Sequence, residues 1–213
     1  MRGRLHWKRP LTTKHRSQSK CFFAQKSAAP VDWKIAPCFN SPVFTSPCPH
    51  SRAYIAFGSN LGDRHAHLLA AREQLCTTAG IDCVAASSLY ESQPCGGPGG
   101  QGLYLNAVVA ITTALAPLAL LQRLQSIEEE HGRVRNERWA ERTLDLDLLF
   151  YDALILRTGT LTLPHPRLHE RAFVLLPCAE VAPTLLHPVY GQTILSLSEG
   201  IDRSGIWRSK QRW

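Results

Sequence analysis

The chain has 213 residues, of which 44% are hydrophobic, and its formal net charge is +7. This length suffices for one sizeable core, so we expect a single domain with an appendage. No stretch reaches the roughly 20 apolar residues of a membrane-spanning helix, and no secretory signal core is present, which predicts a cytoplasmic protein without membrane association. Seven cysteines without a C-x-x-C pair are typical of reduced thiols in that compartment.

The positive charge is concentrated in the first quarter of the chain. Residues 1–50 contain nine Lys or Arg residues against one acid, Asp32, whereas the remainder is close to neutral. Six prolines and the lack of periodicity predict that residues 1–51 form a disordered basic tail ahead of a folded domain at 52–213. A solvated tail, or a start codon placed too far upstream, is favoured over an organelle transit peptide because the segment lacks an amphipathic stretch.

The folded domain is predicted to open with a strand followed by a helix. The apolar run 53–58 favours a strand that ends in a glycine-rich turn. A helix is expected over about 64–79, where leucines recur at helical spacing after an aspartate that can cap the first turn. The stretch 81–92 is β-prone, and residues 93–102 are so rich in Gly and Pro that they predict a mobile loop.

The second half repeats the order of strand, helix and strand. Residues 105–113 favour a strand, and Pro117 is typical of a helix start and precedes the apolar stripe of 118–130. A further strand is expected over 144–151 and a further helix over 170–181. This order predicts an α+β fold in which a ferredoxin-like antiparallel sheet carries both helices on one face, with C-terminal additions.

Two carboxylates on the last strong strand are the first candidates for chemistry. Asp145 and Asp147 alternate with Leu144, Leu146 and Leu148, so both should point to the same face of the sheet. Carboxylates this close repel each other unless a cation lies between them, and hard oxygen ligands suit Mg²⁺ shared with substrate phosphates. Taken alone, the pair fits a half-exposed edge strand with two solvated acids better.

Four arginines lie just ahead of these acids, in a segment without regular periodicity: Arg133, Arg135, Arg138 and Arg142. A guanidinium donates paired hydrogen bonds to phosphate oxygens, and its charge does not titrate. A polyphosphate bridged by Mg²⁺ would satisfy the arginines and the acids together. The alternative is a set of surface ion pairs with neighbouring glutamates, each of which would contribute little. The combination predicts an enzyme that acts on phosphate.

Other polar residues extend this candidate site. Gln125 and Glu128 are three residues apart on the predicted helix and face the same way, either to hold a nucleotide or as a polar helix flank. His165 follows a short strand in a rigid Pro-His-Pro turn, from which it could donate to a phosphate. His169 is four residues further on, but a zinc site is disfavoured because no third ligand has suitable spacing.

Six segments resemble the 6-hydroxymethyl-7,8-dihydropterin pyrophosphokinase family, colinearly over about residues 53–200. They are Ala-Phe-Gly-Ser-Asn-Leu-Gly (56–62), Tyr-Leu-Asn-Ala (104–107), Gly-Arg-Val-Arg (132–135), Glu-Arg-Trp (137–139), Arg-Thr-Leu-Asp-Leu-Asp (142–147) and Pro-His-Pro-Arg-Leu-His-Glu-Arg-Ala-Phe (164–173). The resemblance implies that pyrophosphate is transferred from ATP to a pterin alcohol in folate biosynthesis, with two Mg²⁺ ions as cofactors and AMP as the second product.

The resemblance also implies roles for individual residues. Asp145 and Asp147 are expected to bind the Mg²⁺ ions, with Arg133 and Arg142 acting beside them in catalysis. The expected ATP contacts are Gln125, Glu128, Arg133, Arg135, Arg138, Trp139, Arg142, Leu148, Thr162, His165 and Arg171. The expected pterin contacts are Ser92, Gln93, Pro94, Cys95, Tyr104, Asn106, Asp145 and Phe173. Tyr104 and Phe173 would enclose the ring, although the residues alone indicate core positions for both.

The loops at 96–102 and 132–142 are expected to close over ATP, which should bind before the pterin. Three departures from the family are the short spacing between Arg135 and Arg138, the residues Gln93 and Cys95, and the basic tail. The expected partners are ATP and 6-hydroxymethyl-7,8-dihydropterin, bound by a monomer. An RNA-binding module is disfavoured because the basic charge lies off the domain and the strands lack paired aromatics. A relative that transfers a single phosphoryl group is the other alternative, and its product would be ADP.

Overall fold

The computed structural model describes residues 50–94, 100–133 and 141–213, so the predicted tail lies almost wholly outside the described residues. The strands are β1 (Ser51–Ser59), β2 (Ile81–Ala86), β3 (Tyr90–Ser92), β4 (Tyr104–Thr113), β5 (Asp145–Tyr151), β6 (Leu156–Arg157), β7 (Thr162–Leu163) and β8 (Ile206–Arg208). The helices are α1 (Arg64–Cys76), α2 (Pro117–Glu130), α3 (Ala172–Val181) and α4 (Ile194–Glu199), with a 3₁₀ turn at Leu168–Glu170. Within the described ranges, no helix is long and apolar enough to cross a membrane.

One antiparallel sheet organises the domain. Its order is β5-β1-β4-β3-β8, and β2 also pairs with β4. The long strand β4 therefore pairs with β1 on one edge, and on the other edge with β2 near Thr113 and β3 near Tyr104. β6 and β7 form a separate two-stranded ribbon. The predicted mixture of helices with an antiparallel sheet is confirmed.

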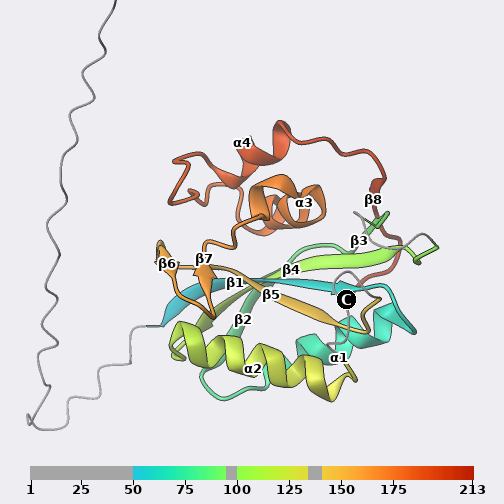
Figure 1. Ribbon diagram of the computed structural model, residues 1–213, viewed down its shortest axis with the longest axis horizontal. Helices are drawn as coiled ribbons and strands as arrows, with labels where there is room; N and C mark the ends of the chain where they lie inside the picture. Colours follow the sequence, from blue (N-terminus) through green and yellow to red (C-terminus); the bar gives the residue numbers. More distant parts are fainter. Residues whose placement is uncertain (1–49, 95–99, 134–140) are drawn as a thin grey trace, which may run out of the picture. The chain divides into compact units, whose positions relative to one another are not determined.

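Helices cover both faces of this sheet (Figure 1). α1 and α2 share one core, in which Phe57 and Val109 of the sheet meet residues such as Leu124. α3 and α4 lie against the opposite face, over Val108 and Phe150. Neighbouring strand residues such as Val108 and Val109 enter different cores because side chains alternate along a strand. The helices predicted over 64–79 and 118–130 thus share one face, while the helix predicted over 170–181 lies with α4 on the other.

Several element boundaries differ from the predicted ones for local reasons. α1 begins after Asp63, whose carboxylate accepts a hydrogen bond from the Ala66 amide at 3.0 Å, as predicted. It ends at Cys76 rather than near residue 79, because the Thr77 hydroxyl and amide both donate to the Glu73 carbonyl, at 2.8 and 2.9 Å. The β-prone stretch 81–92 forms two strands, since the Ser87 hydroxyl accepts the Val108 amide at 3.0 Å.

Cys76 and Cys83 form a disulfide, so the expectation that all seven cysteines are reduced is wrong. Gly80, at φ +78°, turns the chain from α1 into β2 and brings the two Cα atoms within 5.4 Å. The pairing depends on this turn, and the spacing of the two cysteines alone does not predict it. Cys178 is buried and free, and burial raises the pKa of its thiol to about 12.

We expect the disulfide to stabilise the fold by about 2 kcal/mol, because it closes a short loop of the unfolded chain. Cys76→Ser should lower the free energy of unfolding by this amount in urea titrations under oxidising conditions. Reductant should bring the wild type to the level of the variant and leave the variant unchanged. Equal stability of the two proteins without reductant would contradict the expectation.

Candidate active site

Asp145 and Asp147 lie on the face of the sheet that α3 covers. Along β5, Leu146 and Leu148 are buried in the core beneath α1 and α2, while the two aspartates are half-buried. Alternation along the strand therefore directs both carboxylates to the opposite face, as predicted. β1 pairs with this strand so that Gly58 lies opposite Asp145.

The sheet register brings Asn106 and Asp145 onto one row. Gly58 pairs with Asn106 on one side and with Asp145 on the other. A Cβ atom at Gly58 would lie 3.7 Å from Asn106 Oδ1 and 3.8 Å from the Asp145 Cβ, so a longer side chain would fill the space between them. Glycine therefore leaves the amide and the carboxylate facing each other across β1.

Asn106 is held in a defined orientation. Its side chain is buried, and Nδ2 donates to Ser92 Oγ at 3.0 Å and to the Tyr90 carbonyl at 3.4 Å. Its Oδ1 is the atom on the Gly58 side. Tyr104 shares its strand face, and Phe173 of α3 packs at the border of the core above that face. The two aromatics singled out in the sequence thus lie on the same side of the sheet as Asp145.

Two arginines contact the first carboxylate from either side. Arg133 Nη1 lies 2.7 Å from Asp145 Oδ1, and Arg142 Nη1 lies 2.8 Å from Oδ2. The Arg133 side chain is 14% exposed, so solvent screens this pair weakly. The structure thus brings two of the four arginines to the acids, whereas Arg135, Arg138 and Trp139 lie outside the described residues.

Glu128 links α2, β5 and the arginine segment. It is 1% exposed, far more buried than a polar helix flank would be. Its Oε1 accepts the Leu146 amide at 2.7 Å and also the guanidinium of Arg133. The Glu128 carboxylate therefore fixes both β5 and Arg133. Gln125 of the same helix is half-buried.

Asp147 has a raised pKa although its side chain is 36% exposed. Burial and then the charge of Asp145 raise its pKa to about 6, against the opposing effect of Arg171 and of the two arginines at Asp145. Arg171 Nη1 lies 3.7 Å from Asp147 Oδ2, and His165 Nε2 lies 3.8 Å from the same oxygen. A cation placed between the two carboxylates would remove the repulsion that contributes to this raised pKa.

His165 is neutral at pH 7. Burial, together with the charges of Arg171 and Arg167, lowers its pKa to about 4. Its Nδ1 accepts the Arg167 amide at 3.3 Å, which leaves the ring proton on Nε2, the nitrogen that faces Asp147. The Pro-His turn therefore presents a hydrogen-bond donor without a positive charge.

Four buried side-chain atoms accept or donate no hydrogen bond within the described parts of the chain: Ser59 Oγ, Asn60 Nδ2, Thr143 Oγ1 and Asp145 Oδ1, the last of which has only its ion pair with Arg133. All four lie where β1 ends and β5 begins. Unsatisfied buried polar atoms are costly and rare, so this cluster indicates a polar ligand.

The oxygens of this cluster suit a metal ion that substrate atoms help to hold. Asp145 Oδ1 is a hard oxygen ligand of the kind that Mg²⁺ prefers. No group of three or more His, Cys, Asp or Glu in the described ranges could hold a metal alone.

Sequence reasoning missed Asn60 as a positioning residue. The backbone N–H of Asn60 donates to the Arg142 carbonyl at 3.1 Å, and the side-chain Oδ1 of Asn60 accepts a hydrogen bond from the backbone N–H of Arg142 at 2.8 Å. The sequence signal for Asn60 was its place between the two glycines of the 58–62 turn. The arginine segment that it contacts lies far along the chain. Only the sheet register shows that these two segments meet.

The remaining expected contacts fall into three groups. Leu148 is buried on the opposite face from the carboxylates, so only its backbone can reach a ligand there. Thr162 lies on β7 and is half-buried. Ser92 ends β3, with Gln93 and Pro94 directly after it, while Cys95 lies outside the described residues.

Comparisons with known proteins place the chain among pterin enzymes. The family model described as 7,8-dihydro-6-hydroxymethylpterin-pyrophosphokinase matches residues 54–183. The 2-amino-4-hydroxy-6-hydroxymethyldihydropteridine pyrophosphokinase of Synechocystis is 42% identical over 73% of this chain and 78% of its own length. The enzyme of the same name from Methylorubrum extorquens is 45% identical over 74% of this chain and 98% of its own length.

A crystal structure of Plasmodium falciparum HPPK-DHPS with pterin and p-hydroxybenzoate is similar to the chain with a TM-score of 0.57 at 15% identity. The match covers 73% of this chain and 44% of that chain, so this protein corresponds to less than half of the solved one. At this identity the likeness supports the fold alone.

We expect Glu128→Ala to lower the free energy of unfolding by about 3 kcal/mol, because it leaves the buried Leu146 amide without its acceptor and removes one of the two carboxylates that hold Arg133. The matched control is Glu129→Ala, an exposed neighbour whose loss should cost less than about 0.5 kcal/mol. Urea titrations of both variants measure the difference. A Glu128 variant as stable as the control would show that the buried carboxylate has no such role.

Asp147 should make stability depend on pH. A carboxyl pKa of about 6 in the folded state means that the folded protein binds more protons than the unfolded chain between about pH 4 and 6, so stability falls as pH rises through this window. Asp147→Asn should therefore match the wild type near pH 4 and exceed it by about 1 kcal/mol at pH 8. The value is reduced for solvent screening because the side chain is 36% exposed.

Chemical denaturation in metal-free buffer at both pH values measures this effect. A difference between variant and wild type that does not change with pH would contradict it.

Proposed function

The chain belongs to the 7,8-dihydro-6-hydroxymethylpterin-pyrophosphokinase family, and on this premise we propose that it transfers pyrophosphate from ATP to 6-hydroxymethyl-7,8-dihydropterin and releases AMP. A pyrophosphokinase of folate biosynthesis is what the named relatives indicate. The observation that carries the proposal is the convergence of Asp145, Asp147 and two arginines beside the buried amide of Asn106.

Asp145 and Asp147 are the proposed ligands of two Mg²⁺ ions. When bound, the ions would neutralise phosphate charge and orient the oxygens of ATP. The incompletely satisfied Oδ1 of Asp145 and the raised pKa of Asp147 both support this assignment. In the proposed reaction the pterin hydroxymethyl oxygen attacks the β-phosphorus, and the bond from that phosphorus to the oxygen of the α-phosphate breaks.

The arginines are proposed to exchange partners when ATP binds. Arg133 and Arg142 now neutralise Asp145, and phosphate oxygens would replace the carboxylate as their acceptors. Arg171 and the Nε2–H of His165 would donate from the Asp147 side. Because none of these groups needs to change protonation state at pH 7, their contribution is positioning and charge compensation.

The pterin is proposed to lie over the row formed by Asn106, Gly58 and Asp145. Tyr104 and Phe173 would stack on its two faces, and the Asn106 amide with the backbone after β3 would bind its polar edge. This arrangement would place the hydroxymethyl group toward the carboxylates.

For ATP, the proposed contacts lie on α2, β5 and β7. Gln125 and Thr162 would contact the nucleotide with their side chains. Glu128 would act on ATP indirectly, because its carboxylate accepts a hydrogen bond from the guanidinium of Arg133. Leu148 would contact ATP through its backbone.

Further proposals concern the protein as a whole. We propose a ferredoxin-like core, in which α3, α4 and β8 are the C-terminal additions, preceded by a basic tail at 1–51. Arg135, Arg138, Trp139 and Cys95 are proposed to line the site from the segments outside the described residues. We also propose a monomer located in the cytoplasm.

We expect the purified protein to release AMP when it is incubated with ATP, Mg²⁺ and 6-hydroxymethyl-7,8-dihydropterin. Chromatography of the nucleotides measures this product. Asp145→Ala and Asp147→Ala should each lower kcat by at least about 100-fold, because each removes a ligand and leaves phosphate charge uncompensated. Asp82→Ala, which alters an exposed aspartate of β2, is the matched control and should retain turnover. ADP as the sole nucleotide product would instead support single phosphoryl transfer.

A further inference from the structure

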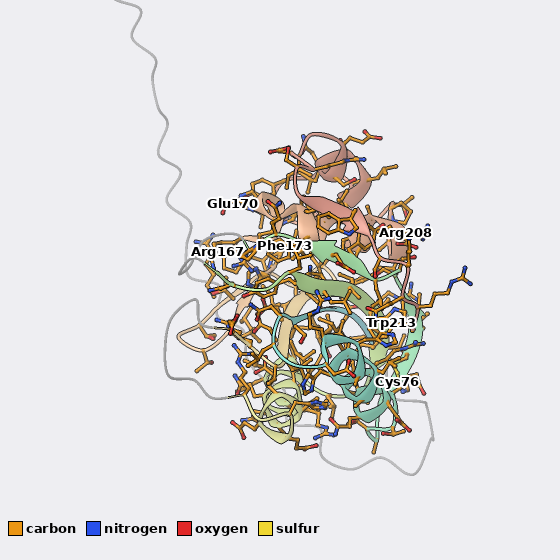
Figure 2. The ribbon with its side chains drawn as sticks, turned by 90° about the vertical axis from the view of Figure 1, so that its right-hand side faces the viewer. Cys76, Arg167, Glu170, Phe173, Arg208 and Trp213 are labelled. Atoms are coloured by element: carbon orange, nitrogen blue, oxygen red, sulfur yellow. A yellow bond between two sulfur atoms is a disulfide. The ribbon has the colours of Figure 1, made fainter. Side chains whose placement is uncertain are left out.

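The end of the chain crosses the edge of the sheet; we call residues 204–213 the C-terminal strap. Its strand β8 pairs with β3, with Tyr90 opposite Arg208 and Ser92 opposite Ile206. Figure 2 shows Arg208 on the side of the α3 layer and Trp213 on the side of α1, which also carries Cys76. The strap thus runs from one helical layer to the other along β3.

Arg208 anchors the strap to α3. Its guanidinium contacts Glu180 at 2.5 Å and also the Ser88 hydroxyl. Glu180 in turn accepts hydrogen bonds from the Ser88 amide at 3.1 Å and from the Tyr90 hydroxyl at 3.1 Å. Burial raises the pKa of Glu180, but the hydrogen bonds from Ser88 and Tyr90 and the charge of Arg208 outweigh burial and leave it below its ordinary value. One carboxylate therefore ties β3 and the strap to the same helix.

Trp213 anchors the other end. Its indole Nε1 donates to the Ser87 carbonyl at 2.6 Å, and its ring packs edge-on against Phe57 at 5.8 Å between centroids. The guanidinium of Arg72 in α1 lies 5.0 Å from the same ring. With both ends attached to the body of the domain, the strap acts as a fixed outer neighbour for β3.

β3 has three residues and pairs with a neighbouring strand on each edge. A strand this short with one neighbour is marginal in water, and here β4 and β8 pair with it on opposite edges. Ser92 and the Tyr90 carbonyl accept the two hydrogen bonds that orient the Asn106 amide. The position of β8 is therefore transmitted through β3 to the amide in the candidate site.

Gly205 is the residue of the strap that lies against Gln93, directly after β3. The Gln93 amide donates to the Gly205 carbonyl at 2.9 Å. Gly205 has φ +73°, and a Cβ atom on it would lie 3.0 Å from Gln93 Oε1 and 3.1 Å from Cδ. A side chain at this position would force the Gln93 carboxamide to move, because 3.0 Å is shorter than an ordinary carbon–oxygen contact.

We propose that the C-terminal strap positions Ser92, Gln93 and Asn106 for the pterin, with Gly205 as the positioning residue that lets the strap approach. The inference rests on the proposed function, because it takes the pterin as the ligand of these residues. The strap contacts β3, α3 and α1 and, within the described residues, makes no contact with Asp145 or Asp147. It should therefore act on the pterin and leave the binding of ATP unchanged.

The test is Gly205→Ala, compared with Gly191→Ala. Gly191 has a similar φ of +67°, but a Cβ atom on it would meet nothing within 4 Å, so this variant reproduces the backbone strain without the contact to Gln93. We expect Gly205→Ala to raise KM for 6-hydroxymethyl-7,8-dihydropterin about tenfold, with KM for ATP unchanged, whereas Gly191→Ala should leave both constants at the wild-type values. Gly205→Asn supplies a second variant, since asparagine tolerates the left-handed region and still places a Cβ atom there.

A double-variant cycle isolates the contact. Gln93→Ala removes the atoms that meet the new Cβ, so Gly205→Ala added to Gln93→Ala should change KM for the pterin by less than about twofold. Fluorescence titration with 6-hydroxymethylpterin, in the presence of Mg²⁺ and α,β-methylene-ATP, should show the same loss of affinity as KM. A Gly205→Ala protein with wild-type pterin affinity, or with equal increases in both KM values, would overturn the inference. Absence of AMP from the wild-type protein would overturn the proposed function instead.

Discussion

The electrostatic repulsion between Asp145 and Asp147 is the constraint around which the rest of this site is arranged. The strand pleat places both carboxylates on one face, and burial raises the pKa of the second. Without ligand, Arg133 and Arg142 compensate the first carboxylate, and Glu128 holds Arg133 from behind. The site is thus an array of fixed charges that balance one another.

Much of the fold could be predicted because its signals are local. Strand alternation, the Asp63 cap and Pro117 at the start of α2 each follow from residues near one another in sequence. The carboxylate pair and the resemblance to a known family directed attention to the same strand. Segments 134–140 and 95–99 hold part of the predicted site and lie outside the described residues, so those residues stay predictions.

What sequence reasoning missed depends on contacts between distant segments. Asn60 binds the backbone of Arg142, and Glu128 binds the amide of Leu146, although neither pair is adjacent in sequence. The Cys76–Cys83 pairing requires the left-handed turn at Gly80, and β8 becomes a strand only because β3 offers it an edge. A helix or strand pattern carries no information on which distant partner completes it.

β4 supplies both a binding surface and the centre of the sheet. It presents Tyr104 and Asn106 to the candidate site, while Val108 and Val109 enter the two different cores. Opening β4 would therefore disrupt both cores at once, so its amides should exchange with solvent mainly through global unfolding. Any ligand held by this strand then stabilises the whole domain, by an amount that grows with the ligand concentration relative to its Kd. Occupancy of the site would therefore also lower the rate at which proteases cleave the protein through its unfolded form.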